Sequence, residues 1–252
     1  VTNPKLYFTP EQIEAYRTGS DPIMYPNMDW KKYIFHNLYL QSQNNVNISG
    51  GNDNVQYFVS VGYTYQNGLL KELPGQLYDN NYRYNRYNYR ANLDFDVTKT
   101  TLLSVNIGGR IETKRTPESD EDQNQLFRKL YWAVPFAGAG IINGKRVITN
   151  PDIVPKPGTD GLASYYGKGF RTRTTNVLNV DLALNQKLDF ITKGLSLKLK
   201  GAYNSSYSNT KKGSSSAAYY VPLVDDDGAI TYRKEGSDTQ MSYSDGDFGK
   251  AR

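Results

Sequence analysis

The chain has 252 residues, no cysteine, 22 tyrosines and a formal net charge of +5 at neutral pH. Without cysteine, these residues hold no disulfide, no thiolate metal ligand and no cysteine nucleophile. Basic residues are interleaved with acidic ones, so no basic cluster of the kind that follows a nucleic-acid backbone is present. The mean hydropathy is -0.67 and no apolar run approaches about 18 residues, which excludes a transmembrane helix. The first residue is Val1 and no leader sequence follows it, so we expect a piece of a longer polypeptide.

Residues 1–44 are predicted to be a lead-in with one short helix. Thr9 is placed to cap a helix that begins with proline, and Gln12 completes a capping box three residues later. Gly19 is expected to end this helix. A turn-rich segment with two prolines follows and leads to a run at 33–40, which we predict to be a short strand.

From residue 45 onward, apolar and polar residues alternate, which predicts an all-β fold of antiparallel strands. In the clearest run, at 55–66, Val59 and Val61 share one face and Ser60 lies on the other. This run is close to the roughly 9–11 residues that a tilted strand needs to cross a bilayer. Strands are predicted at 45–49, 55–66, 84–96, 101–113, 176–190 and 195–207, with weaker ones at 218–224 and 229–234.

The connections between these strands alternate in length. Short turns at 50–54, 97–100 and 191–194 alternate with long loops at 67–82, 114–175 and 209–217. Gly50 and Gly51 are expected to supply positive φ angles in the first short turn, and the longest loop contains one predicted helix, at 120–133. Transmembrane barrels combine short periplasmic turns with long extracellular loops, and carry aromatic residues near the strand ends. We therefore predict that residues 45–252 form part of a transmembrane β-barrel.

Several ordered motifs lie between residues 7 and 109. They comprise Pro26, Asn27, Asp29 and Trp30 in YPNMDW, then Ser49, Gly50 and Gly51 in the SGG turn, then Gly68 after a tyrosine-rich strand, and finally the segment RYNRYNYRAN. In this order they resemble the start of the barrel in SusC/RagA-type TonB-dependent outer-membrane transporters. The resemblance is weaker after residue 109, where the long loop with its helix still fits.

The resemblance implies a function in nutrient import. Members of that family have a large barrel filled by an N-terminal plug, take energy from TonB in the inner membrane, and pair with a SusD-like surface lipoprotein that covers the barrel. They import oligosaccharides or oligopeptides across the outer membrane. We find no TonB box and no plug sequence in these residues, so TonB is expected to act through a region outside them. The resemblance implies neither an enzymatic activity nor a cofactor, and it implies contact with outer-membrane lipid.

Two sets of residues are candidates for contacts within such a transporter. Arg86, Asn88, Arg90 and Asn92 lie opposite the tyrosine face of one strand and would point into the lumen if the tyrosines face lipid. There they would bond plug carboxylates or a hydroxyl-rich substrate, and we favour the plug. Tyr131, Trp132, Tyr165 and Tyr166 lie in the long loop and would contact the substrate, contact the lid protein, or pack within the loop.

No catalytic or metal site is predicted. His36 is the only histidine and nothing local places it in a catalytic triad, so we interpret it as a turn or wall residue. The run Asp225, Asp226, Asp227 contains ligands that calcium uses, but Asp-Gly between two short strands favours a hairpin turn instead.

Two other functional classes stay open. A soluble or surface-exposed β-sandwich that binds glycans would also show alternating strands, but with short loops at both ends. A glycosidase would need a pair of carboxylates in a cleft, and nothing in the sequence places such a pair.

Overall fold

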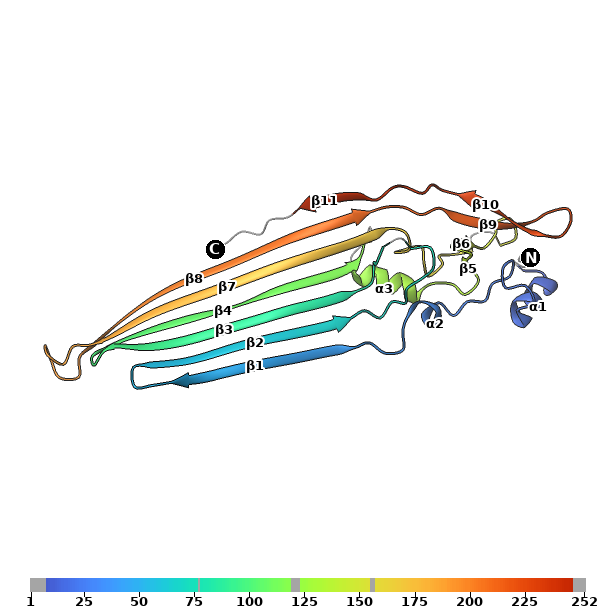
Figure 1. Cartoon of the computed structure of the whole chain (residues 1–252). Helices are drawn as coiled ribbons and strands as arrows, with labels where there is room; N and C mark the ends of the chain where they lie inside the picture. The colour runs from blue at the N-terminus through green and yellow to red at the C-terminus, as the bar shows by residue number, and fades with distance from the viewer. Residues whose placement is uncertain (1–7, 77, 119–122, 155–156, 247–252) are drawn as a thin grey trace, which may run out of the picture.

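A computed structural model describes residues 8–76, 78–118, 123–154 and 157–246. Seven strands form one antiparallel sheet in the order β1-β2-β3-β4-β7-β8-β11 (Figure 1). They are β1 (Gln41–Gly51), β2 (Val55–Asn67), β3 (Arg83–Thr98), β4 (Thr101–Pro117), β7 (Gly169–Lys187), β8 (Ser196–Ser214) and β11 (Ser242–Gly246). The predicted all-β fold of antiparallel strands is therefore confirmed, and the described strands form an open sheet with β1 at one edge.

The register of the strands sorts the side chains onto two faces. Pairing is regular along β1 to β8 apart from one irregularity between Asp96 and Thr98. One row across β2, β3, β4 and β7 reads Val61, Tyr89, Gly109 and Leu178, and the adjacent row reads Ser60, Arg90, Gly108 and Asn179. Because side chains of neighbouring rows point to opposite faces, the sheet has an apolar face and a polar face.

Short and long connections lie at opposite ends of the sheet (Figure 1). The short ones are 52–54, 99–100 and 188–195, and the long ones are 68–82, 118–168 and 215–241. In the first short turn, Asn52 Oδ1 accepts hydrogen bonds from the backbone N–H groups of Asn54 and Val55. The expectation of positive φ at Gly50 and Gly51 is wrong, since neither residue is in that conformation. A Cβ at Gly50 would instead meet the Tyr57 hydroxyl at 2.6 Å, so close approach of a side chain explains the glycine.

The long connections and the lead-in form a second unit, which we call the loop layer (residues 8–40, 68–82, 118–168 and 215–241, where described). It contains α1 (Pro10–Thr18), α2 (Trp30–Ile34) and α3 (Gln123–Tyr131). It also contains a four-stranded sheet in the order β10-β9-β6-β5, made of β5 (Gly138–Ile142), β6 (Lys145–Ile148), β9 (Tyr219–Val224) and β10 (Ile230–Glu235). Among the described residues, no helix is both long and apolar enough to cross a membrane.

The hydrophobic core lies in the loop layer. Its central cluster consists of Trp30, Ile34, Leu70, Leu73, Leu130, Leu162, Tyr165 and Tyr166. Among the described residues, every buried hydrophobic side chain belongs to this layer, apart from Pro117 at the end of β4 where the strand meets the layer. The long sheet thus has no buried apolar core of its own.

Several predicted elements differ from the observed ones. The expected strand at 33–40 is wrong: Asp29 accepts a hydrogen bond from the Lys32 N–H and caps the short helix α2, after which only Phe35 forms an isolated bridge. The expected loop at 209–217 is strand as far as Ser214, because β7 and β11 pair with it on both sides. β5, β6 and β11 were not predicted at all.

Both predicted helices are present. α1 has the expected capping box between Thr9 and Gln12, and Gly19 ends it in the left-handed conformation. Tyr16 of α1 packs edge-on against Tyr25 and Phe136, which attaches the helix to the long loop. α3 lies within the predicted span 120–133, of which 120–122 are outside the described residues.

Candidate functional site

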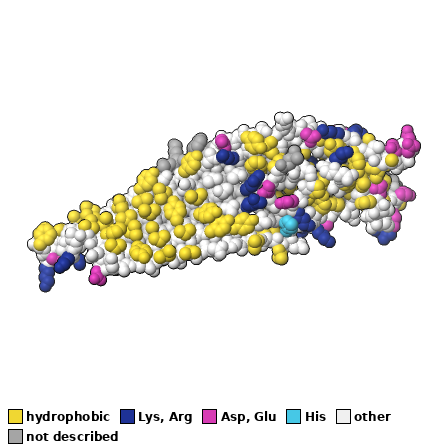
Figure 2. All heavy atoms as spheres, viewed as in Figure 1, with side chains coloured by type: hydrophobic (Ala, Val, Ile, Leu, Met, Phe, Trp, Pro, Cys, Tyr) yellow, Lys and Arg dark blue, Asp and Glu magenta, His cyan; other side chains and the backbone are white. Residues whose placement is uncertain are grey.

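The apolar face of the seven-stranded sheet is exposed over most of its length. Figure 2 shows hydrophobic side chains gathered over the part of the sheet that is remote from the loop layer. Val46, Val61 and Leu182, on three different strands, keep 65%, 52% and 49% of their surface accessible. Monomeric soluble proteins rarely expose an apolar patch of this extent, so this face is a candidate contact surface.

The apolar residues on this face form a band of limited height. It runs from Val55 to Tyr65 on β2, and covers positions 87–95 on β3 and 103–111 on β4. Tyrosines mark the end of the band that is nearer the loop layer, where Tyr63 and Tyr87 stack with their ring centroids 4.8 Å apart. Beyond the band, the same face of β4 and β7 continues with threonines, and the hydroxyls of Thr113 and Thr174 lie 3.4 Å apart.

The polar face carries the four residues predicted to face a lumen. Arg86, Asn88, Arg90 and Asn92 all lie on the face opposite Tyr87 and Tyr89. Among the described residues, the buried Nε of Arg86 has no hydrogen-bond partner, and Arg90 makes no ion pair. These side chains are therefore available to an element that covers this face.

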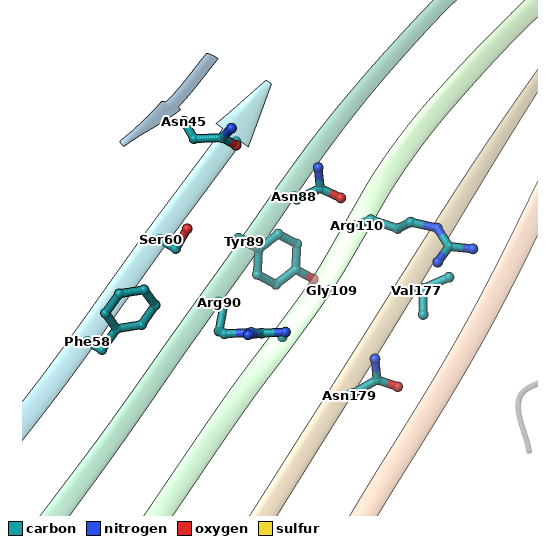
Figure 3. Close-up of a pocket in the computed structure, with 12 residues that line it drawn as sticks. Asn45, Phe58, Ser60, Asn88, Tyr89, Arg90, Gly109, Arg110, Val177 and Asn179 are labelled. Atoms are coloured by element: carbon teal, nitrogen blue, oxygen red, sulfur yellow. The ribbon is translucent and has the colours of Figure 1, made fainter. Parts of the chain in front are cut away.

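A hollow of about 440 Å³ lies on the polar face of the sheet. Small residues form its floor, with Ser60 and Gly62 on β2 and Gly108 on β4. In Figure 3 the side chains of Arg90 and Arg110 lie among the lining residues, together with the amides of Asn45, Asn88 and Asn179. Sequence reasoning missed this hollow; the signal for it was the glycine pair 108–109 inside an otherwise regular strand pattern.

The YPNMDW signature attaches the lead-in to the longest loop. Trp30 is buried and its Nε1 donates a hydrogen bond to the Val134 carbonyl at 2.8 Å. The Met28 N–H donates to the Pro135 carbonyl at 2.9 Å, and the amide of Asn27 reaches the Tyr16 carbonyl at 3.4 Å. Two of these hydrogen bonds hold the lead-in against the longest loop, and the third lies within the lead-in.

The same segment also holds the loop between β2 and β3. The N–H groups of His36 and Lys71 bond the carbonyls of Leu69 and Ile34, at 2.7 and 2.8 Å. A Cβ at Gly161 would come within 2.6 Å of the Ile34 side chain and 3.0 Å of the Trp30 ring, so a larger residue would have to displace both side chains. We call residues 28–36 the clasp, because they fix two long loops in one arrangement.

The four aromatic candidates of the long loop divide into two pairs. Tyr131 and Trp132 are exposed at 71% and 64%, and the Arg128 guanidinium lies 4.1 Å from the Trp132 ring centroid. Tyr165 and Tyr166 are buried in the core cluster. They pack within the loop layer and present little surface to a ligand. Burial, assisted by the nearby phenol of Tyr33, raises the pKa of the Tyr165 hydroxyl well above its ordinary range.

The acidic turn and the single histidine have simple structural roles. The Asp225 carboxylate accepts hydrogen bonds from the N–H groups of Asp227 and Ala229, which closes the hairpin between β9 and β10. His36 is exposed on the surface of the loop layer (Figure 2). In the part of the chain that the structure describes, no group of three or more His, Asp or Glu side chains is placed to hold a metal ion.

A second cavity, of about 550 Å³, lies in the loop layer and was also missed from sequence. Its walls come from residues 75, 76 and 78 and from the segments 144–146, 166–167, 215–220 and 238–243, which no local pattern brings together.

Compared with known proteins, the chain matches no family model, no curated protein and no solved structure. Its function is therefore argued from its own geometry and from the motifs of its sequence.

Proposed function

We propose that this chain is part of a transmembrane β-barrel of the outer membrane, in an importer of oligosaccharides or oligopeptides that resembles the SusC/RagA-type transporters. In this proposal the apolar face of the seven-stranded sheet contacts lipid and the polar face lines the inside of the barrel. A SusD-like lipoprotein covers the loop layer, and TonB supplies energy through a plug outside these residues.

The observation that carries the proposal is the exposed apolar face of a sheet that has no apolar core of its own. Burial of apolar surface is the dominant stabilising term in folding, at about 25 cal/mol per Å². A face of this kind is stable when a partner or a lipid phase covers it. The band at 55–65 on β2 matches the roughly 9–11 residues of a tilted membrane strand.

Three further features support the membrane assignment. The short turns and long connections lie at opposite ends of the sheet, as periplasmic turns and extracellular loops do (Figure 1). Tyrosines lie at the loop-layer end of the apolar band, where aromatic side chains favour the membrane interface. Unpaired backbone groups at a sheet edge are not tolerated in lipid, so the free edge of β1 needs a further strand to pair with it.

The proposed mechanism is binding and passage, without covalent chemistry. The loop layer, fixed by the clasp, presents Tyr131 and Trp132 on its surface, and such rings stack on sugar or peptide groups. The polar face below offers hydrogen-bonding side chains such as Asn88 and Asn179 along the route through the barrel. Displacement of the plug would then open that route.

A glycan-binding β-sandwich is less compatible with the geometry. A sandwich packs the apolar faces of two sheets against each other, about 10 Å apart. Here the four-stranded sheet lies beyond the ends of the long strands and leaves their apolar residues exposed (Figure 1).

Fractionation of the natively expressed full-length gene product tests the proposal. We expect it in the outer membrane, with a gel mobility that changes on boiling, because closed barrels resist unfolding in detergent until they are heated. A product that is soluble and unshifted would remove the transporter interpretation and leave the sandwich as the better one.

A further inference from the structure

Basic residues predominate on the polar face of the seven-stranded sheet. Alternation along the paired strands places Arg86, Arg90, Arg110, Lys114, Arg171, Arg173, Lys198, Lys200 and Lys212 on this face, against Asp94, Asp96, Glu112 and Asp181. Three of these basic residues already have acidic neighbours. Arg110 lies 3.4 Å from Glu112, Lys200 lies 3.6 Å from Asp181, and Arg171 donates two hydrogen bonds of 3.0 Å to the carboxylate of Glu118, just beyond β4. The face therefore keeps an excess of positive charge, which attracts an acidic partner.

The hollow on this face lies among these basic residues. Arg90 and Arg110 both line it, and the unpartnered Nε of Arg86 belongs to the next row of the same face, beside Glu112. The amides of Asn88 and Asn179 add neutral donors (Figure 3). A guanidinium matches a carboxylate with two parallel hydrogen bonds, so this set of donors suits an Asp or Glu side chain.

The sheet itself does not require glycine at the floor of the hollow. A Cβ added at Gly108 would meet no atom closer than the Tyr89 carbonyl at 3.8 Å, which is an ordinary contact. At Gly109, by contrast, a Cβ would collide with the Val177 carbonyl and meet the Tyr89 hydroxyl at 2.5 Å. Glycine at 109 is explained by the packing of Tyr89, whereas glycine at 108 keeps a space open.

We infer that this hollow is a docking site for an acidic polypeptide segment, which places a carboxylate between Arg90 and Arg110. The segment lies across β2 to β7 on the polar face, and its backbone and side chains bond the surrounding Asn residues. The inference rests on the proposed function only in that the polar face is the enclosed side of the sheet. The positive charge of the face favours an acidic segment, and the open space at Gly108 leaves room for its side chain.

A site-directed photocross-link tests this inference. The full-length protein would carry Ser60→Cys as its only cysteine, labelled with benzophenone, because Ser60 lines the hollow. After irradiation in whichever fraction contains the protein, mass spectrometry identifies the attached molecule. We expect the label to attach to a polypeptide segment that has an Asp or Glu within about three residues of the attachment point. Three residues of extended chain cover about 10 Å, roughly the reach of the labelled side chain.

Substitutions then distinguish loss of the arginine charges, and filling of the hollow, from a general effect on folding. Replacing both arginines, Arg90→Gln with Arg110→Gln, is expected to lower the cross-link yield about tenfold or more, since charge-assisted hydrogen bonds are lost. Lys198→Gln with Lys200→Gln, on the same face but near the short turns, is the matched control and should leave the yield unchanged.

A second, independent test fills the part of the hollow next to Gly108. Gly108→Leu is expected to abolish the cross-link without loss of folded protein. Gly201→Leu lies on the opposite face, where an added Cβ would meet no atom within 4 Å, and it should have no effect on the cross-link.

Three outcomes would overturn the inference: attachment to lipid or sugar, attachment to a segment without acidic residues, or a yield that the arginine substitutions do not change. Absence of any cross-link would also overturn it. Fractionation decides the membrane proposal separately, because the chemistry of the cross-linked partner does not depend on which fraction holds the protein.

Discussion

Replacement of Trp30 is expected to loosen the loop layer and leave the long sheet intact. Trp30 is 4% exposed and packs with Ile34 against Gly161, so Trp30→Ala should destabilise the layer by about 3–5 kcal/mol. Trp30→Phe keeps an aromatic ring but loses the hydrogen bond to the Val134 carbonyl. That carbonyl also accepts from the Ala137 N–H at 3.0 Å, so it is not left unpaired and the lost bond should cost about 1 kcal/mol.

Hydrogen exchange of the full-length protein, read by mass spectrometry, measures this effect. The amides of His36 and Lys71 join the clasp to the loop after β2, so they report on opening of the layer. A factor of ten in protection corresponds to about 1.4 kcal/mol, so Trp30→Ala should lower their protection more than about a hundredfold and Trp30→Phe about fivefold. Peptides from β4 are the internal control. Equal loss of protection in β4, or equal effects of the two variants, would refute the role of Trp30 in the clasp.

Three further predictions concern the two faces of the sheet and one buried phenol. Val59→Arg, in the apolar band, should cost about 2–4 kcal/mol and reduce the heat-modifiable membrane fraction, while Ser60→Arg on the polar face should not; equal yields would contradict the assignment of the faces. Burial raises the pKa of Tyr82 to about 12, and its buried hydroxyl has no partner in the described structure. Because the folded state then keeps this proton longer than the unfolded state, loop-layer stability should fall as pH rises from about 10 to about 12. Tyr82→Phe should remove that part of the dependence, as measured by protease resistance across this pH range; an unchanged pH profile would count against it. Gly109→Ala should lower the yield of folded protein because its Cβ meets the carbonyl of the neighbouring strand, whereas Gly108→Ala should be tolerated, and the reverse order of yields would be inconsistent with the structure.

The strands were predicted well where one face is apolar. β2 was expected at 55–66 and observed as Val55–Asn67, because period-two alternation is a property of the local sequence. The extensions of β7 and β8 beyond the apolar band were missed because both strands are polar there and show no alternation of apolar and polar residues. Threonines and arginines of β7 lie opposite serine and lysines of β8. Their strand conformation comes from pairing with neighbours that are distant in sequence.

The loop layer was predicted less well, for physical reasons that its residues illustrate. α2 has five residues, too few for helical periodicity, and depends on the Asp29 cap and on burial of Trp30. Tyr165 is buried in a cluster with Trp30 and Leu70, which come from segments distant from it in sequence. The signature residues were recognised from sequence, but their role in the clasp required the position of Val134, more than a hundred residues away.

Labels on two adjacent residues of β2 would show whether the apolar face of the seven-stranded sheet contacts lipid. Val59→Cys and Ser60→Cys would each carry a fluorophore in the full-length protein, reconstituted with lipids brominated in the acyl chains. Because neighbouring residues of a strand point to opposite faces, we expect strong quenching at residue 59 and little at residue 60. Equal quenching at both positions, or none at 59, would contradict it.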